Sequence, residues 1–275
     1  MSNIQMRLGF IGTGNIAAAL VEGFCTLPAC PYDVAVSPRN AEKAQGLAGR
    51  FEPVQVAADN QAVIDSSDIV FLALRPQIAE SVLRQLRFRE NQTIVSLIGA
   101  ASVARIRELV APVRAVFRAV PLPPAAQHVG PIILYPDDPA VGSMLGRIGE
   151  LYAVSDENHL NVLTAITALI SPFFALLGET ARWAEAAGVD RSIARSYTAA
   201  MFHAISTQAL TMPVTSFSEL GAEAATPGGL NEKALAVIRK QGGYTAFLAG
   251  LDAVAVRLGL KRPRSISSKA AKAKR

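Results

Sequence analysis

Two spacings of apolar residues divide the chain into strand-like and helix-like segments. Short apolar runs typical of strands lie at residues 7–11, 33–37, 68–74, 93–97, 115–120, 131–135 and 151–154. Segments with helical spacing of apolar residues lie between them, among them 41–51, 78–86 and 103–109. This alternation predicts an α/β fold that is built on a doubly wound sheet.

The pattern changes near residue 155. From there to residue 260 the sequence has the composition of Ala-rich and Leu-rich helices, and no further strand is expected. We therefore expect three parts, which are an α/β domain of residues 1–154, an all-helical domain of residues 155–260, and a basic tail of residues 261–275.

The first strand runs directly into a glycine motif. Residues 12–17 read Gly-Thr-Gly-Asn-Ile-Ala and precede a helical pattern. Gly12 allows a tight turn, Gly14 allows the backbone to approach a ligand, and Ala17 allows the helix to pack on the strand. The motif predicts a Rossmann-type dinucleotide site in which Gly12, Thr13, Gly14, Asn15 and Ile16 contact the cofactor. The alternative is a structural turn without a ligand.

The end of the second strand indicates which dinucleotide is bound. NAD-preferring sites place a carboxylate there, whereas residues 36–40 read Val-Ser-Pro-Arg-Asn. A hydroxyl at Ser37 and a guanidinium at Arg39 suit the 2′-phosphate of NADP(H). The alternative is that Arg39 merely caps a surface turn.

The apolar run 68–74 is continuous, as expected of a strand that is buried on both faces of a parallel sheet. Ligands of such sheets bind beyond the carboxyl ends of the strands. We therefore expect a cofactor crevice that includes Ala73, Leu74, Arg75, Pro76 and Gly99.

Composition narrows the class of protein. Apolar residues make up 51% of the chain and aromatic residues 6%, which suits a globular α/β enzyme. Cys25 and Cys30 are the only cysteines, too few for a disulfide framework or a four-ligand zinc site. We therefore expect a reducing, cytoplasmic environment.

Positive charge is concentrated at the C-terminus. Residues 261–275 carry seven Lys and Arg and no acid, and removing those charges from the formal +5 leaves about −2 for the rest. We therefore expect no specific nucleic-acid surface on the folded part. The tail has the composition of a disordered appendage, and weak contact with nucleic acid or anionic surfaces is the alternative.

The most membrane-like stretch is 162–178. It is near the lower length limit for a membrane span, and Ser171-Pro172 interrupts it. We expect a buried helix at a subunit interface and no membrane insertion. The N-terminus contains no apparent signal peptide, because its first apolar segment is short and interrupted by glycines.

Two features of the helical part suggest chemistry. The turn Thr226-Pro227-Gly228-Gly229, ahead of a helix expected near Asn231, offers backbone amides and a hydroxyl to a substrate anion, and the alternative is a capped interhelical turn. His203 is either a packed helix residue or a polar group that reaches into the active site. No histidine has metal-ligand spacing, so we expect no metal site.

These motifs together resemble the pyrroline-5-carboxylate reductase family over nearly the whole chain except the tail. The resemblance rests on 9–17, 36–40, 71–77 (with Arg75 in place of lysine), 102–106 and 242–244, and Asn60 falls where the family places an asparagine near the adenosine. It implies NADP(H) as cofactor and at least a homodimer, formed through the helical domain, in which each active site joins one chain's nucleotide domain to the partner's helices.

The substrate side departs from the family pattern. Residues 120–124 read Val-Pro-Leu-Pro-Pro instead of Met-Pro-Asn-Thr-Pro, and 168–174 read Ala-Leu-Ile-Ser-Pro-Phe-Phe instead of a Ser- and Gly-rich loop. Asn231 occupies the position of the threonine that faces the imine. Missing polar partners weaken the binding of a small amino-acid carboxylate.

Our leading hypothesis is an NADPH-dependent reductase of a C=N bond whose substrate is larger or more apolar than pyrroline carboxylate. The turn 226–229 would hold an anionic group and Asn231 would orient the imine. The first alternative is a keto reductase with His203 as proton donor. The second is a catalytically inactive NADP-binding dimer with a regulatory role.

Overall fold

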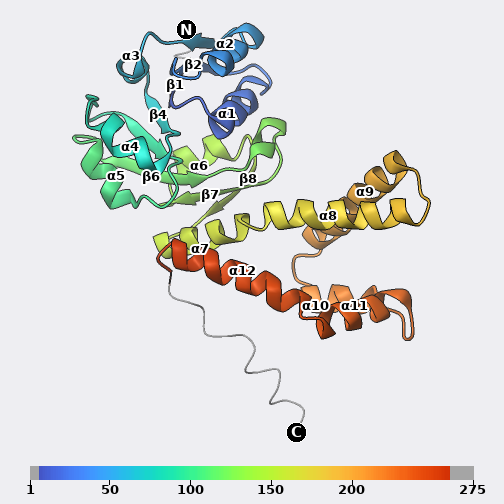
Figure 1. Cartoon of the computed structure of the whole chain (residues 1–275). Helices are drawn as coiled ribbons and strands as arrows, with labels where there is room; N and C mark the ends of the chain where they lie inside the picture. Colours follow the sequence, from blue (N-terminus) through green and yellow to red (C-terminus); the bar gives the residue numbers. More distant parts are fainter. Residues whose placement is uncertain (1–5, 261–275) are drawn as a thin grey trace. The chain divides into compact units, whose positions relative to one another are not determined.

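The computed structural model in Figure 1 describes residues 6–260. The chain divides into two compact units, one through Leu163 and one from Thr164 onward. This division falls inside helix α7 (Glu157–Thr167). The boundary expected at 154/155 precedes that helix, and the basic tail expected at 261–275 lies outside the described residues.

A single sheet of eight strands forms the centre of the first unit, within the described residues. The strands are β1 (Met6–Ile11), β2 (Tyr32–Val36), β3 (Val54–Val56), β4 (Ile69–Leu72), β5 (Thr93–Ser96), β6 (Ala115–Val120), β7 (Pro131–Tyr135) and β8 (Glu150–Ala153). Their order is β3-β2-β1-β4-β5-β6-β7-β8, and every neighbouring pair is parallel except β6 and β7. The chain reverses its direction of winding between β1 and β4, which places a ligand crevice at their carboxyl ends.

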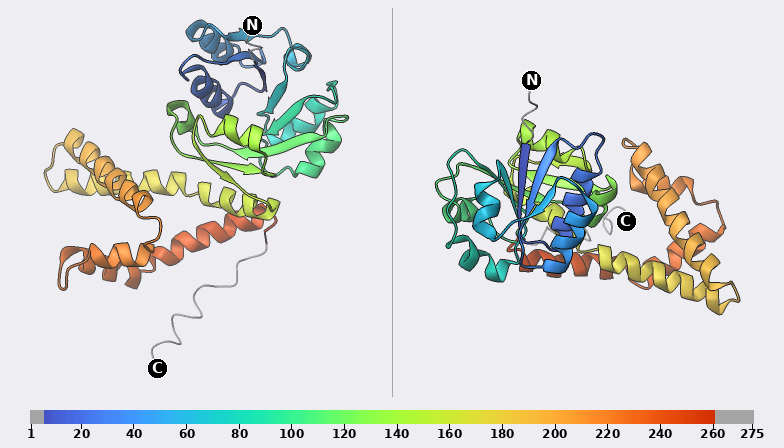
Figure 2. Two further views of the ribbon diagram at one scale, coloured as in Figure 1. Left: turned by 180° about the vertical axis from the view of Figure 1, so that it is seen from behind. Right: turned by 90° about the horizontal axis from the view of Figure 1, so that it is seen from above.

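Helices cover both faces of this sheet, as the right view of Figure 2 shows. They are α1 (Asn15–Cys25), α2 (Ala41–Arg50), α3 (Asn60–Asp65), α4 (Pro76–Leu83), α5 (Val103–Leu109) and α6 (Pro139–Leu145), with a short 3-10 helix η1 at Pro123–Gln127. Two separate clusters of buried apolar side chains result. Phe10 belongs to one cluster and the next residue, Ile11, to the other, because successive strand side chains point to opposite faces.

The second unit consists of helices. They are the end of α7, then α8 (Ile170–Ala186), α9 (Arg191–Thr211), α10 (Phe217–Glu223), α11 (Leu230–Lys240) and α12 (Gly243–Arg257). Helices α8 and α9 lie side by side (Figures 1 and 2), and the rings of Phe173 and Phe202 meet edge to face at 5.8 Å between centroids. A capping box begins α10, and the Ser216 hydroxyl and backbone N–H hold the pKa of Glu219 below its usual value.

The second unit has almost no core of its own. Its buried residues, within the described part, are Ala165, Ala181, Ala194, Thr198 and Ala255. Large apolar side chains are exposed instead, including Phe174 at 65%, Trp183 at 75%, Tyr197 at 70% and Leu210 at 67%. Apolar helix faces of this extent are stable when another surface covers them.

The membrane-like helix is interrupted at another position than predicted, and its burial at a subunit interface stays a prediction. The stretch Glu157–Ala186 is long and apolar enough to cross a membrane by length and composition, which is weak evidence by itself, and it is mostly exposed in the single chain. The helix is interrupted by a turn at residues 168 and 169, not at Ser171-Pro172. Pro172 lies in the first turn of α8, where a missing N–H costs no helical hydrogen bond.

A buried ion pair attaches α7 to the sheet. The side chain of Arg118 on β6 is 4% exposed, and its Nη1 donates to Glu157 Oε1 at 2.8 Å and to Asn161 Oδ1 at 3.0 Å. The same Glu157 oxygen accepts the N–H of Val103 at 2.8 Å. This carboxylate therefore joins α7, β6 and the first turn of α5.

Replacing Glu157 by alanine is expected to lower the free energy of unfolding by about 3 kcal/mol, because the Arg118 guanidinium stays buried without its partner. Glu157→Met combined with Arg118→Met should recover most of the loss. Urea titration followed by circular dichroism measures both. The control is Glu90→Ala, whose partner Arg114 is 86% exposed, and it should change nothing measurable. Equal effects of the two alanine variants would refute this role for Glu157.

Candidate functional site

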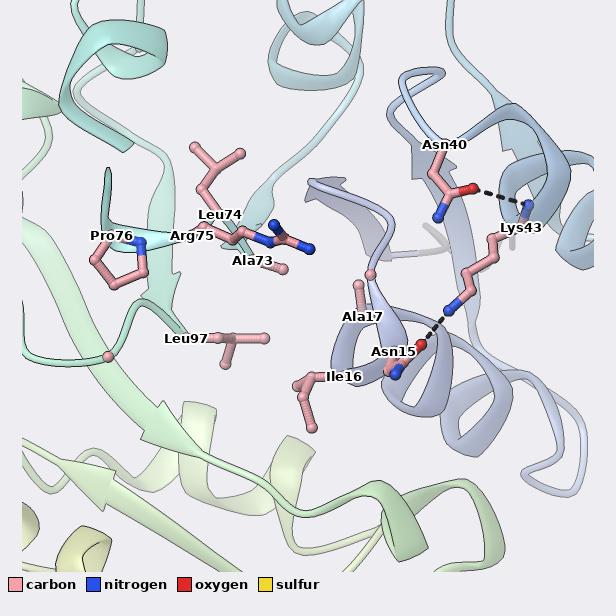
Figure 3. Close-up of a pocket in the computed structure, with 12 residues that line it drawn as sticks. Asn15, Ile16, Ala17, Asn40, Lys43, Ala73, Leu74, Arg75, Pro76 and Leu97 are labelled. Carbon is pink, nitrogen blue, oxygen red and sulfur yellow. Dashed lines mark hydrogen bonds between the residues drawn. The ribbon is translucent and has the colours of Figure 1, made fainter. Parts of the chain in front are cut away.

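A cavity of about 450 Å³ opens at the carboxyl ends of β1, β4 and β5. It is lined by Gly14, Asn15, Ile16, Ala17, Asn40, Lys43, Ala73, Leu74, Arg75, Pro76, Leu97 and Gly99. Figure 3 shows a polar wall formed by Asn15, Asn40 and Lys43, and an opposite wall from Leu74 to Pro76 with Leu97. The cavity thus lies at the point where the winding of the sheet reverses.

The glycine loop between β1 and α1 approaches its neighbours closely. Gly12 has φ +95°, and a Cβ there would lie 2.5 Å from the carbonyl oxygen of Ala73. At Gly14 a Cβ would meet nothing within 4 Å, so this residue borders open space in the cavity. Gly14 is also the N-cap of α1 and supplies no side-chain cap. The first-turn amides of α1 therefore remain available to an anion such as a pyrophosphate.

The loop is held from the second strand. Ser37, directly after β2, accepts the N–H of Gly12 on its Oγ at 2.9 Å, and its backbone oxygen accepts the Thr13 hydroxyl at 2.7 Å. The Asn40 amide donates to the backbone oxygen of Thr13 at 3.2 Å. Ser37 and Thr13 are 1% and 3% exposed. These bonds fix the path of the backbone that leads into α1.

Two cations follow β2. Lys43, in the first turn of α2, lines the cavity, and its ammonium donates to Asn15 Oδ1. Arg39 is exposed in the turn ahead of α2 and does not line the cavity, and no ion pair joins it within residues 6–260. A cofactor phosphate near this turn would meet positive charge without a competing carboxylate in the cavity lining.

The opposite wall is mostly apolar. Ala73 and Leu74 follow β4, Arg75 is the exposed N-cap of α4, and Pro76 is its first residue. Leu97 and Gly99 come from the loop after β5. Leu74 is 9% exposed and joins the core cluster on that face of the sheet. The apolar part of this wall, Ala73, Leu74 and Leu97, suits the flat ring of a cofactor because it excludes water, and Arg75 adds a positive charge beside it.

Most of the predicted cofactor residues come together in this cavity. Those that line it are Gly14, Asn15, Ile16, Ala73, Leu74, Arg75, Pro76 and Gly99. Those that do not are Gly12, Thr13, Ser37, Arg39 and Asn60, and Asn60 begins α3 beyond β3. The sequence analysis missed Lys43, Asn40, Ala17 and Leu97 as lining residues. The signal available for Lys43 was its spacing, three residues after the N-cap Asn40 and on the same side of α2.

The candidate substrate turn lies between α10 and α11. Gly228 has φ +71°, and its N–H donates to Glu232 Oε2 at 2.6 Å. The Asn231 amide donates to the carbonyl oxygen of Ala224 at 2.7 Å. A Cβ on Gly229 would lie 2.2 Å from Thr226 Oγ1, so the turn needs glycine there. One amide expected to face a substrate anion is therefore bonded to the chain's own carboxylate, and the role of the turn stays a prediction.

His203 is exposed on α9, and its backbone oxygen accepts the Thr207 hydroxyl at 3.0 Å. It is not packed within the single chain, and both expectations, a packed helix residue and a group that reaches into the active site, stay predictions. Within residues 6–260, no group of three or more His, Cys, Asp or Glu is placed to hold a metal ion.

Comparison with known families divides the chain as the fold does. Residues 7–99 match the family model described as NADP oxidoreductase coenzyme F420-dependent. Residues 157–262 match the model described as pyrroline-5-carboxylate reductase dimerisation. Among curated proteins, the pyrroline-5-carboxylate reductase of Pseudomonas aeruginosa is 26% identical over 261 residues, which cover 91% of this chain and 95% of that protein.

Solved structures share the same fold over almost their whole length. The 1-pyrroline-5-carboxylate reductase of Streptococcus pyogenes superposes with a TM-score of 0.81 at 20% identity, covering 92% of this chain and 98% of that one. The Plasmodium falciparum pyrroline carboxylate reductase with NADP bound gives 0.79 at 16% identity, covering 92% and 97%. The chain therefore matches the pyrroline-5-carboxylate reductase family in its helical part, by the dimerisation model, and over nearly its whole length, by the curated relative.

Proposed function

We propose that this protein is an NADPH-dependent reductase of a C=N bond, and that its substrate is larger or more apolar than pyrroline-5-carboxylate. The observation that carries the proposal is the cavity at the switch point of the sheet, where an uncapped helix N-terminus meets a lysine and an apolar wall. Similarity to pyrroline-5-carboxylate reductases supports the reaction class, and the NADP-bound Plasmodium falciparum structure supports the cofactor.

The residues of the cavity fit NADP(H) in two places. The first-turn amides at Asn15 and Ile16 would bind the pyrophosphate, and Gly14 leaves room for it. Lys43 and Arg39 would bind the 2′-phosphate, since both cations border the end of β2, where NAD-preferring sites carry a carboxylate.

The chemistry divides between the cofactor and the protein. When bound, NADPH supplies the hydride for the C=N carbon. Leu74, Leu97 and Gly99 would shield the nicotinamide from water. The cavity lining contains no carboxylic acid or imidazole, which suits an imine that arrives already protonated and needs no strong acid from the wall.

The substrate proposal rests on three altered segments. Leu122, which precedes η1 and is half-buried, replaces an asparagine, and the segment 168–174, with Leu169 and Ile170, replaces a Ser- and Gly-rich loop. The turn 226–229 is kept, whereas Asn231 replaces the threonine that faces the imine, and both are the candidate contacts to the substrate. Loss of polar donors and gain of apolar bulk both favour a more apolar imine.

A homodimer is part of the proposal. The second unit exposes apolar helix faces that need cover, and its residues match a dimerisation model. A second copy of the chain is the partner that carries complementary faces by symmetry.

Cofactor choice tests the assignment of Lys43. Lys43→Ala should raise the dissociation constant of NADPH about tenfold through loss of a charge-assisted hydrogen bond, and change that of NADH less than about twofold. Fluorescence titration of both cofactors measures this. Arg114→Ala, an exposed change of equal charge on the same unit, is the matched control and should affect neither cofactor. Equal weakening of both cofactors by Lys43→Ala would argue against a 2′-phosphate contact.

Substrate choice tests the reaction. NADPH oxidation should be faster with bulky cyclic imines than with pyrroline-5-carboxylate, and Leu122→Asn should shift the ratio of kcat/KM toward pyrroline-5-carboxylate by about tenfold. A panel of cyclic imines and 2-ketoacids measures this, with His203→Ala as the second variant. Turnover of ketoacids alone, abolished in His203→Ala, would show that the reaction class is wrong.

Assembly tests the exposed helix faces. Sedimentation should give at least a dimer, and Phe174→Asp with Tyr197→Asp should raise the dissociation constant about 100-fold, because two charges enter an apolar interface. Ser81→Asp, an exposed change on α4, is the control for added charge. If the protein without substitutions is a stable monomer, this part of the proposal is contradicted.

A further inference from the structure

The position of Ser37 suits a phosphate ligand, but its burial does not. It occupies the end of β2, where the pattern Val-Ser-Pro-Arg-Asn predicts a contact to the 2′-phosphate. The structure nevertheless buries it to 1% exposure, and it does not line the cavity. Its neighbour two residues on, Arg39, is exposed. The two predicted phosphate ligands therefore differ in their access to a ligand.

The hydroxyl of Ser37 is hydrogen-bonded within the protein, and its single donor is committed there. Its oxygen accepts the N–H of Gly12 at 2.9 Å. Thr13 Oγ1 gives its proton to the Ser37 backbone oxygen at 2.7 Å, so at the 3.2 Å contact between the two hydroxyls Ser37 is the donor. The one O–H of Ser37 is thereby committed to Thr13, and no donor remains for a phosphate oxygen.

The partners of Ser37 are the backbone of the glycine loop. Gly12 is the residue with φ +95° that packs against the Ala73 carbonyl, and Thr13 is held a second time through Asn40. Two residues later α1 begins at Asn15, whose first-turn amides border the cavity. A change at Ser37 therefore alters the direction in which these amides point.

We propose that Ser37 and Thr13 form a buried hydroxyl pair that positions the glycine loop for the pyrophosphate, and that Lys43 and Arg39 alone bind the 2′-phosphate. This inference rests on the proposed function only in requiring that a dinucleotide binds. Ser37 is thus a positioning residue for both NADPH and NADH. Its contribution to affinity is independent of the 2′-phosphate.

Two fragments of the cofactor separate these roles. ADP carries a diphosphate and no 2′-phosphate, whereas adenosine 2′-monophosphate carries the 2′-phosphate and no diphosphate. Ser37→Ala should raise the dissociation constants of ADP, NADH and NADPH by the same factor, about tenfold, because the Gly12 N–H loses its acceptor and the loop shifts. It should leave the dissociation constant of adenosine 2′-monophosphate within about twofold of its value for the unsubstituted protein. Calorimetric titration of the full chain measures all four.

A second variant and two controls keep the test decisive. Thr13→Val removes the other hydroxyl at nearly constant volume and should give the same pattern, and the double variant should be no worse than either single one. Lys43→Ala should show the reverse pattern, weakening adenosine 2′-monophosphate and sparing ADP. Thermal unfolding of each variant shows whether the fold is intact, and loss of stability without a change in ADP affinity would overturn the positioning role.

Selective weakening of NADPH and adenosine 2′-monophosphate by Ser37→Ala would overturn the inference in favour of a direct 2′-phosphate contact. Unchanged binding of all four ligands would overturn it as well. Failure of the unchanged protein to bind any dinucleotide would contradict the proposed function and this inference together. Tight binding without turnover would contradict only the proposed reaction.

Discussion

The close approach of Gly12 to the carbonyl of Ala73 determines where the first unit can bind an anionic ligand. A Cβ at Gly12 would lie 2.5 Å from that oxygen. The connection from β1 to α1 can therefore pass this close to the end of β4 only if residue 12 is glycine. This passage brings the first turn of α1 to the reversal point of the sheet, between β1 and β4. Parallel strands leave their carboxyl ends open there, and the uncapped amides of α1 give that opening a preference for anions.

The two units obtain their stability differently. The first has two apolar clusters, one on each face of a continuous sheet, and stacked rings at Phe10 and Phe71 with centroids 4.6 Å apart. The second buries mainly alanines and exposes its large apolar side chains. Its apolar helix faces therefore make association the second constraint on function, because a partner must cover them. The Arg118–Glu157 pair connects α7, the helix in which the two units meet, to the sheet.

The sequence was sufficient to predict the elements with the clearest apolar pattern and most of the residues that line the cavity. Continuous apolar runs predicted β6 and β7 at their observed bounds, and the glycine motif predicted the turn into α1. The short elements β3 and α3 were missed, because three to six residues carry too little periodicity to identify.

The differences between the predicted site and the residues that line the cavity have one cause. Residue type predicts what a side chain can bind, but burial and existing hydrogen bonds decide whether it is free to bind it. Ser37 has a suitable hydroxyl, yet that hydroxyl is committed to the glycine loop. Lys43 was identifiable only by its spacing after the N-cap Asn40, and the fold of α2 brings its ammonium to Asn15. The same limit applies to Gly228, whose amide is bonded to Glu232.

The central claim is that the α1 N-terminus holds the pyrophosphate of NADPH while Lys43 holds its 2′-phosphate. A crystal structure of the complex tests it most directly. The account predicts pyrophosphate oxygens within about 3 Å of the first-turn amides of α1, the 2′-phosphate within about 3 Å of Lys43 Nζ, and Ser37 Oγ still bonded to Gly12. A 2′-phosphate bonded to Ser37 and remote from Lys43, or a cofactor bound away from the glycine loop, would contradict it.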